Sequence, residues 1–128
     1  MSVKRHIMET FGEFLKFKRK EKEMTMNELG KALGYSAPYI SDVEKGRRGP
    51  FDIVKLDLLV EILDLNKQEA AKMMELAGEY RGEIAPDLPE YIKGREYVSY
   101  ALRTAKELNA DEDDWERFVN ELKEREKK

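Results

Sequence analysis

Two helix-start signals lie on either side of a glycine in the N-terminal half of the chain, and this arrangement constrains the fold most. Thr25 lies three residues before Glu28, the spacing at which two side chains cap each other's backbone N–H groups at a helix start. Gly34 ends that helix, because glycine adopts a left-handed conformation at little cost. Ser36 is the next cap, and Pro38 fits a first helical turn. The segment therefore predicts two short helices joined by a tight turn.

Apolar residues at helical spacing extend this pattern on both sides of the pair. One helix is expected within residues 9–23, a fourth begins at the cap Asp52, and residues 66–79 form a fifth. The fold class is therefore all-α, with a five-helix domain over residues 1–80. The expected inward positions are Phe11, Phe14, Leu15, Leu29, Ala32, Leu33, Ile40, Val43, Ile53, Leu56, Leu59, Val60 and Leu63.

The helix that begins after Asp52 carries a second apolar face. Val54, Leu58 and Ile62 recur every four residues, so this helix is apolar over more of its circumference than one core contact requires. Either the fifth helix or the C-terminal part covers that face within the chain, or the face forms a seam between two subunits.

A cluster of helix breakers separates the first five helices from the rest of the chain. Residues 81–94 contain Gly82, Pro86, Pro89 and Gly94, which indicates a connector. Residues 95–128 then form a C-terminal helical extension of two amphipathic helices, expected to pair with each other, with the fourth helix or with a second subunit. We interpret it as a dimerisation or partner-binding element. Its apolar positions are Val98, Ala101, Leu102, Ala105, Leu108, Trp115, Phe118, Val119 and Leu122.

The charge of the chain is divided unevenly along its length. The net charge is -3, but residues 1–50 hold 11 Lys and Arg against 7 Asp and Glu, whereas residues 51–128 hold 13 against 20. The first part is the candidate phosphate-facing part. The acidic second part is expected to point away from a nucleic acid.

The composition argues against an enzyme and against a metal or cofactor site. Cysteine is absent and His6 is the only histidine, which excludes a disulfide framework, a thiolate zinc site and a cysteine nucleophile. Asp111 to Asp114 are helix-start charges, because the alternation of a calcium-binding loop is missing. With no apolar run of spanning length and no signal-peptide pattern, the chain is expected in the cytoplasm without a membrane partner.

The stretch TMNELGKALGYSAPYISDVEKGRRGP, from Thr25 to Pro50, resembles the helix-turn-helix of the lambda-repressor-like family, also called the XRE type. The likeness runs from about Phe11 to Met74 and rests on the combination of caps, glycines and the basic turn at the family's spacing. The resemblance implies a transcriptional regulator that binds double-stranded DNA at specific sequences. It further implies a repressor that acts as a homodimer on a palindromic operator.

The resemblance also implies roles for particular residues. The helix opening at Ser36 becomes the recognition helix, while an arginine of the first helix pairs with the glutamate that ends the recognition helix, here Arg19 and Glu44. Thr25 and Asn27 meet a phosphate at the start of the preceding helix. The residues expected nearest the bases are Ser36, Ala37, Pro38, Tyr39, Ser41 and Asp42, and those expected on a phosphate at the other side are Lys45, Arg47 and Arg48.

The sequence departs from the family pattern at positions that bear on DNA readout. Met26 stands where glutamine is usual and cannot make its hydrogen bonds, and Gly30 stands where alanine is common. The recognition residues lack an Arg, Asn or Gln that could pair with a purine. Readout is therefore expected from Tyr39 stacking on thymine methyls, from Ser41, from Asp42 accepting from a cytosine amino group, and from DNA shape.

Alternatives remain at these positions and for the whole chain. Tyr39 can instead pack on the preceding helix, Asp42 can bond a neighbour or repel phosphates, and Arg47 with Arg48 can form a solvated turn. The rival function is an antitoxin or a peptidase-controlled repressor whose C-terminal part binds a partner protein.

Overall fold

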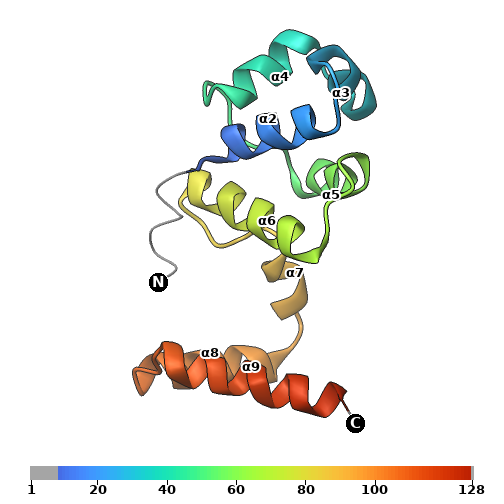
Figure 1. The fold of residues 1–128 in the computed structure, drawn as a ribbon. Helices are drawn as coiled ribbons and strands as arrows, with labels where there is room; N and C mark the ends of the chain where they lie inside the picture. Colours follow the sequence, from blue (N-terminus) through green and yellow to red (C-terminus); the bar gives the residue numbers. More distant parts are fainter. Residues whose placement is uncertain (1–8, 128) are drawn as a thin grey trace. The chain divides into compact units, whose positions relative to one another are not determined.

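The computed structural model describes residues 9–127 and contains helices and turns but no strand in that range (Figure 1). The all-α expectation, with five helices followed by further helices, is confirmed. Backbone contacts divide the chain into two compact units, with the boundary between Glu90 and Tyr91. The helices are α2 (Phe11–Glu21), α3 (Met26–Leu33), α4 (Ala37–Glu44), α5 (Ile53–Ile62), α6 (Lys67–Arg81), α7 (Leu88–Ile92), α8 (Glu96–Glu107) and α9 (Glu112–Glu126).

Local capping explains where the helices of the first unit begin. The Thr25 hydroxyl accepts the N–H of Glu28 at 3.0 Å, and the Glu28 carboxylate accepts the N–H of Thr25 at 2.8 Å. The Ser36 hydroxyl accepts the N–H of Tyr39 at 3.2 Å, and Gly34 ends α3 with a φ of 90°. The predicted caps and the glycine stop are thus confirmed, because these interactions span only a few residues of sequence.

The core of the first unit is built from the inward faces of α2 to α6. Among the expected core positions, Ala32 is exposed and Ile53 is 37% exposed, so these two predictions are wrong. Gly30, not Ala32, is buried against the turn that follows α3, which fixes the rotation of this helix. The buried apolar residues are Phe11, Phe14, Leu15, Leu29, Leu33, Ile40, Val43, Phe51, Leu56, Leu59, Leu63, Leu65, Met73, Met74, Leu76, Ala77 and Ala85.

The second apolar face of α5 is only partly covered. Ile62 is half-buried and packs against the core, but Val54 is 70% exposed and Leu58 is 37% exposed. Of the two interpretations of this face, packing within the chain therefore accounts for Ile62 and leaves Val54 and Leu58 exposed.

The second unit contains α8 and α9 and has no buried residue among residues 91–127. Asp111 caps α9 in a reciprocal pair with Asp114, so the acidic residues here act at a helix start. In the described part of the chain, no helix is long and apolar enough to cross a membrane. The exposed large apolar residues of α8, α9 and the segment between them are Tyr97, Tyr100, Leu102, Leu108, Trp115, Phe118, Val119 and Leu122.

Candidate DNA interface

A close approach at Gly30 sets the geometry of α3 and α4. A Cβ atom at this position would lie 2.4 Å from the carbonyl oxygen of Tyr35, well inside van der Waals contact. The N–H groups of Gly34 and Tyr35 both donate to the Gly30 carbonyl at 2.7 Å. Glycine at position 30 therefore allows the chain to turn back on α3, which accounts for the departure from the family's alanine.

A buried ion pair locks α4 onto α2. The Arg19 guanidinium donates through Nε to Glu44 Oε2 at 2.6 Å and through Nη2 to Glu44 Oε1 at 3.0 Å. The two side chains are only 7% and 2% exposed, and Arg19 also donates to the Met24 carbonyl. The hydrogen bonds to Glu44 raise the pKa of Arg19 above its ordinary value, against the effect of burial. The predicted pair is confirmed, and it fixes the end of α4.

The start of α3 exposes the two residues that were expected to contact a phosphate, while Met26 between them packs against the core. Thr25 and Asn27 are exposed at this helix start, and the Thr25 hydroxyl is already engaged as the cap. Met26, where the family has glutamine, is half-buried and packs against the core. Its side chain contributes apolar contact in place of a polar bridge.

One long edge of α4 is available to a ligand. Ile40 and Val43 are buried, as predicted for core positions of this helix. Ser36 and Pro38 are exposed, and the remaining expected base-facing residues, Ala37, Ser41 and Asp42, are partly exposed. The structure thus brings the small and polar positions of α4 to one accessible side.

The basic turn, residues 45–50, is tied to α4 through Asp42. The Asp42 carbonyl accepts the N–H of Arg47 at 2.8 Å and the N–H of Arg48 at 3.2 Å. The Asp42 carboxylate also lies 3.6 Å from Nη1 of Arg47. Lys45, Arg47 and Arg48 all have exposed side chains, so three cations project beside the end of α4.

Tyr39 is engaged by two neighbours that were not predicted from the sequence. Its ring stacks on the ring of Tyr35, with centroids 4.2 Å apart and planes at 6°. The Arg48 guanidinium carbon lies 4.3 Å from the Tyr39 centroid. The ring faces that were expected to meet thymine methyls are therefore occupied in this structure. The i, i+4 spacing of Tyr35 and Tyr39 across the turn was the available signal.

Tyr35 itself is held between the core and a lysine. Its ring stacks on Phe51 with centroids 5.3 Å apart, and Phe51 is 3% exposed. Burial, with the neighbouring Tyr39 as a smaller cause, raises the pKa of the Tyr35 hydroxyl above its ordinary value. Lys55 lies 5.3 Å from the Tyr35 centroid and donates to the Leu33 carbonyl.

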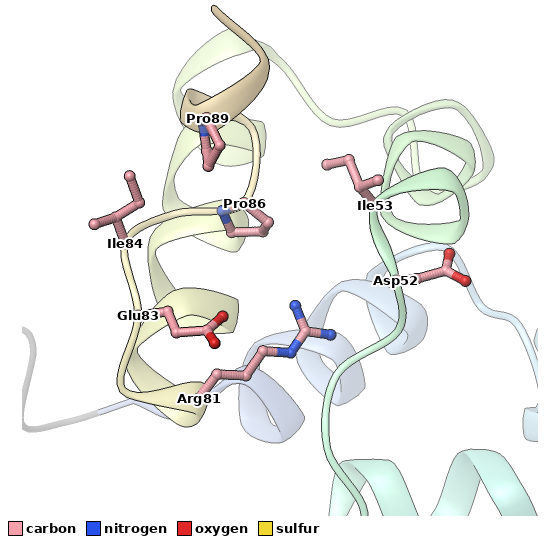
Figure 2. Close-up of a pocket in the computed structure, with 7 residues that line it drawn as sticks. All are labelled: Asp52, Ile53, Arg81, Glu83, Ile84, Pro86 and Pro89. Atoms are coloured by element: carbon pink, nitrogen blue, oxygen red, sulfur yellow. The ribbon is translucent and has the colours of Figure 1, made fainter. Parts of the chain in front are cut away.

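The far end of the basic turn is anchored to α6. Nη2 of Arg81 donates to the carbonyls of Pro50 and Phe51, both at 2.8 Å. Figure 2 shows Arg81 reaching from the end of α6 toward the segment before α5, in an open groove of about 770 Å³. This groove lies between the end of α6 and the segment before α5. It is lined by Asp52, Ile53, Arg81, Glu83, Ile84, Pro86 and Pro89.

No group of three or more His, Asp or Glu side chains within residues 9–127 is arranged to hold a metal ion. The single histidine, His6, lies outside the described residues. The acidic run at the start of α9 is accounted for by helix capping.

The two capped helices α3 and α4, the tight turn between them and the Arg19–Glu44 pair that holds α4 define a helix-turn-helix protein. Residues 15–69 match the family model described as "Helix-turn-helix". The chain is 42% identical over 67 residues to the "ImmF control region 10 kDa protein" of Bacillus phage phi105, covering 51% of this chain and 70% of that protein. It is 46% identical over 52 residues to the "HTH-type transcriptional repressor RghR" of Bacillus subtilis (strain 168), covering 38% of each chain. No solved structure matches the chain significantly.

The chain therefore belongs to the lambda-repressor-like, or XRE-type, helix-turn-helix family. Members of this family regulate transcription by binding DNA, so the protein is a DNA-binding regulator and not an enzyme. The family match ends at residue 69, and it covers neither the end of α6 nor the second unit.

Proposed function

We propose that the protein is a transcriptional repressor that binds a palindromic operator as a dimer and acts in the cytoplasm. The observation that carries this proposal is the accessible edge of α4 beside three exposed cations, in the segment of residues 1–50 that is net positive. The similarity to a protein named as a transcriptional repressor favours repression over activation. Blocking access of the polymerase to the operator is the simplest mechanism.

The proposed roles divide the interface into phosphate contacts and base contacts. Thr25 and Asn27 contact a phosphate at the positive end of α3. Lys45, Arg47 and Arg48 contact the phosphate backbone on the other side of the recognition helix. Ser36, Ala37, Pro38, Ser41 and Asp42 face the base edges of the major groove, with Tyr39 between them and the basic turn.

Asp42 has a specific task in this scheme. Its carboxylate accepts a hydrogen bond from a cytosine amino group, the base donor that suits an acidic side chain. In the free protein this carboxylate lies near Arg47, which offsets its repulsion from phosphates until DNA binds. When Arg47 turns to a phosphate, the carboxylate becomes available to the base.

We assign residues 1–80 to DNA binding, residues 81–94 to a connector and residues 95–128 to subunit pairing. A pair of helices that buries no residue cannot build a core, so it gains little stability from its own packing. A second copy supplies the missing face and closes a four-helix bundle with two-fold symmetry.

The charge pattern of α9 favours a second copy of this chain over an unrelated partner. Trp115, Phe118, Val119 and Leu122 follow the i, i+3, i+4, i+7 spacing of one helical face. This spacing is the same in both directions, as an antiparallel pairing of α9 with itself requires. Acidic residues precede it and basic residues follow it, so antiparallel copies oppose unlike charges. The positions before it, Asp111 to Asp114, are all acidic, and after it Lys123, Arg125, Lys127 and Lys128 outnumber Glu124 and Glu126.

The DNA-binding role is tested by replacing Arg47 and Arg48 with alanine together. Affinity should fall for every duplex sequence, and the slope of log K against log salt should flatten by about 0.9 for each phosphate that the variant no longer neutralises. Lys67→Ala, at an exposed position of α6, is the matched control and should leave the slope unchanged. Wild-type affinity and slope in the double variant would remove the basic turn from the interface.

A further inference from the structure

Four side chains from separate segments pack together around Tyr39 of α4, as three rings with nearly parallel planes and one guanidinium. Tyr35 follows α3, Tyr39 lies in α4, Arg48 lies in the basic turn and Phe51 precedes α5. We call Tyr35, Tyr39 and Phe51 the aromatic stack. Its ring planes are nearly parallel, at 6° between Tyr35 and Tyr39 and 16° between Tyr35 and Phe51.

Arg48 must lie on the outer face of this stack. The Tyr35 ring covers one face of Tyr39 at a centroid distance of 4.2 Å. The Arg48 guanidinium carbon is 4.3 Å from the same Tyr39 centroid. Two groups at such distances cannot share one ring face, so the guanidinium covers the opposite face.

The aromatic stack is fixed to the core at Phe51. Phe51 is 3% exposed and also contacts Phe11 edge to face, with centroids 6.0 Å apart. The backbone of Phe51 is held in turn by Arg81, through the hydrogen bond to its carbonyl. Tyr39 itself lies against Phe51, with centroids 6.4 Å apart and planes at 17°. A side chain that packs on Tyr39 is therefore positioned by the core through the Tyr39 ring, which contacts both Tyr35 and Phe51.

Arg48 is otherwise a long, exposed side chain on a turn, and such a side chain loses rotamer freedom when it binds. Stacking of its planar guanidinium on a ring restricts it beforehand and leaves the N–H edge open for a phosphate oxygen. The electron-rich face of Tyr39 also attracts the cation directly.

We infer that Tyr39 is a positioning residue for phosphate binding, acting through Arg48 rather than by reading a base. This inference rests on the proposed function, in which Arg48 contacts the DNA backbone. Tyr39 then sets the affinity for any duplex and leaves the choice of sequence to the other residues of α4. Its ring is the part that matters, because the contact to Arg48 is made by the ring face.

The test uses the full-length chain with Tyr39→Leu, Tyr39→Phe, Arg48→Ala and the double variant Tyr39→Leu with Arg48→Ala. Each is titrated against a duplex carrying the selected site and against a random-sequence duplex, over a range of salt concentrations. Thermal unfolding of each variant identifies any that fail to fold. Tyr39→Phe retains the ring, so it separates the loss of stacking from the loss of the hydroxyl.

Tyr39→Leu is expected to weaken binding to both duplexes by the same factor and to flatten the salt slope as Arg48→Ala does, by about 0.9. The double variant should bind no worse than Arg48→Ala alone, and Tyr39→Phe should bind with wild-type affinity. A loss confined to the duplex with the selected site, additive losses in the double variant, or loss of binding in folded Tyr39→Phe would overturn the inference. If Arg48→Ala itself changes neither affinity nor slope, the phosphate role of Arg48 fails, and this inference fails with it. If Arg48→Ala weakens binding as expected but the losses in affinity are additive in the double variant, the role of Tyr39 is rejected and the phosphate role of Arg48 is retained.

Discussion

Arg19 and Glu44 illustrate how one pair of residues holds the recognition helix in place. Among residues 9–127, this is the ion pair in which both side chains are less than a tenth exposed. Taking two charges out of water is costly, and the two parallel hydrogen bonds offset that cost only while both partners are present. The pair therefore contributes a defined orientation of α4 more than net stability.

Arg19→Met should lower the free energy of unfolding by about 3–5 kcal/mol, because it leaves the Glu44 carboxylate buried without a partner. The double variant Arg19→Met with Glu44→Leu should recover part of this loss. Urea denaturation measures both effects. Lys20→Met, at the adjacent exposed position, is the control and should change stability by no more than about 0.5 kcal/mol. A loss below about 1 kcal/mol in Arg19→Met would show that the pair does not lock the fold.

Single residues differ in how far the sequence reveals their role. The Arg19–Glu44 pair could be predicted, because the family resemblance aligns both positions. The contacts of Tyr39 with Arg48 and Phe51 could not, since both of these residues lie beyond α4. Contacts that depend on where three separate segments meet leave no periodic signal along the chain.

At the scale of elements, the turn between α3 and α4 depends on glycine at position 30. The helix starts were predictable, because each cap involves residues only three apart. The rotation of α3 was not, since apolar periodicity counts Ala32 as inward and gives no weight to Gly30. Close approach of the backbone at Gly30, and not hydrophobicity, decides which side of α3 faces the core.

Gly30→Ala should therefore destabilise the fold by about 1–3 kcal/mol, although alanine has the higher helix propensity. The added methyl group would meet the Tyr35 carbonyl at 2.4 Å, so the turn and Tyr35 must shift. Chemical denaturation and DNA titration together measure the effect, and both should worsen. Lys31→Ala, on the exposed side of the same helix, serves as control. Equal or greater stability in Gly30→Ala would contradict close packing at this position.

At the scale of the whole molecule, the chain combines a unit with a complete core and a unit with none. The family match and the core both belong to the first unit, and this part of the fold followed from caps, periodicity and resemblance. The amphipathic pattern of α8 and α9 was equally visible. The surface that covers their apolar residues was not visible in the sequence, because an amphipathic pattern indicates that a helix face is buried but does not identify the surface it packs against.

Phe118→Glu should dissociate the proposed dimer, because it places a charge in the centre of the apolar face of α9. Light scattering should give a dimer mass for the wild type and a monomer mass for the variant, with the dimer dissociation constant raised at least about tenfold, a loss of about 1.4 kcal/mol. Asn120→Glu adds the same charge on the other side of α9 and should remain dimeric. Leu58→Glu on α5 tests the competing seam. A folded Phe118→Glu variant that stays dimeric would exclude α9 as the interface.

Selection of bound sequences from a random duplex pool, with the mass of the same sample measured by light scattering, tests whether the protein is a dimeric, sequence-specific DNA-binding regulator. We expect a dimer that enriches a palindromic consensus, with half-sites about 34–36 Å apart, one helical turn of DNA. Absence of enrichment, with a monomer mass that rises only when a separate protein is added, would contradict this function and favour the antitoxin or peptidase-controlled alternative.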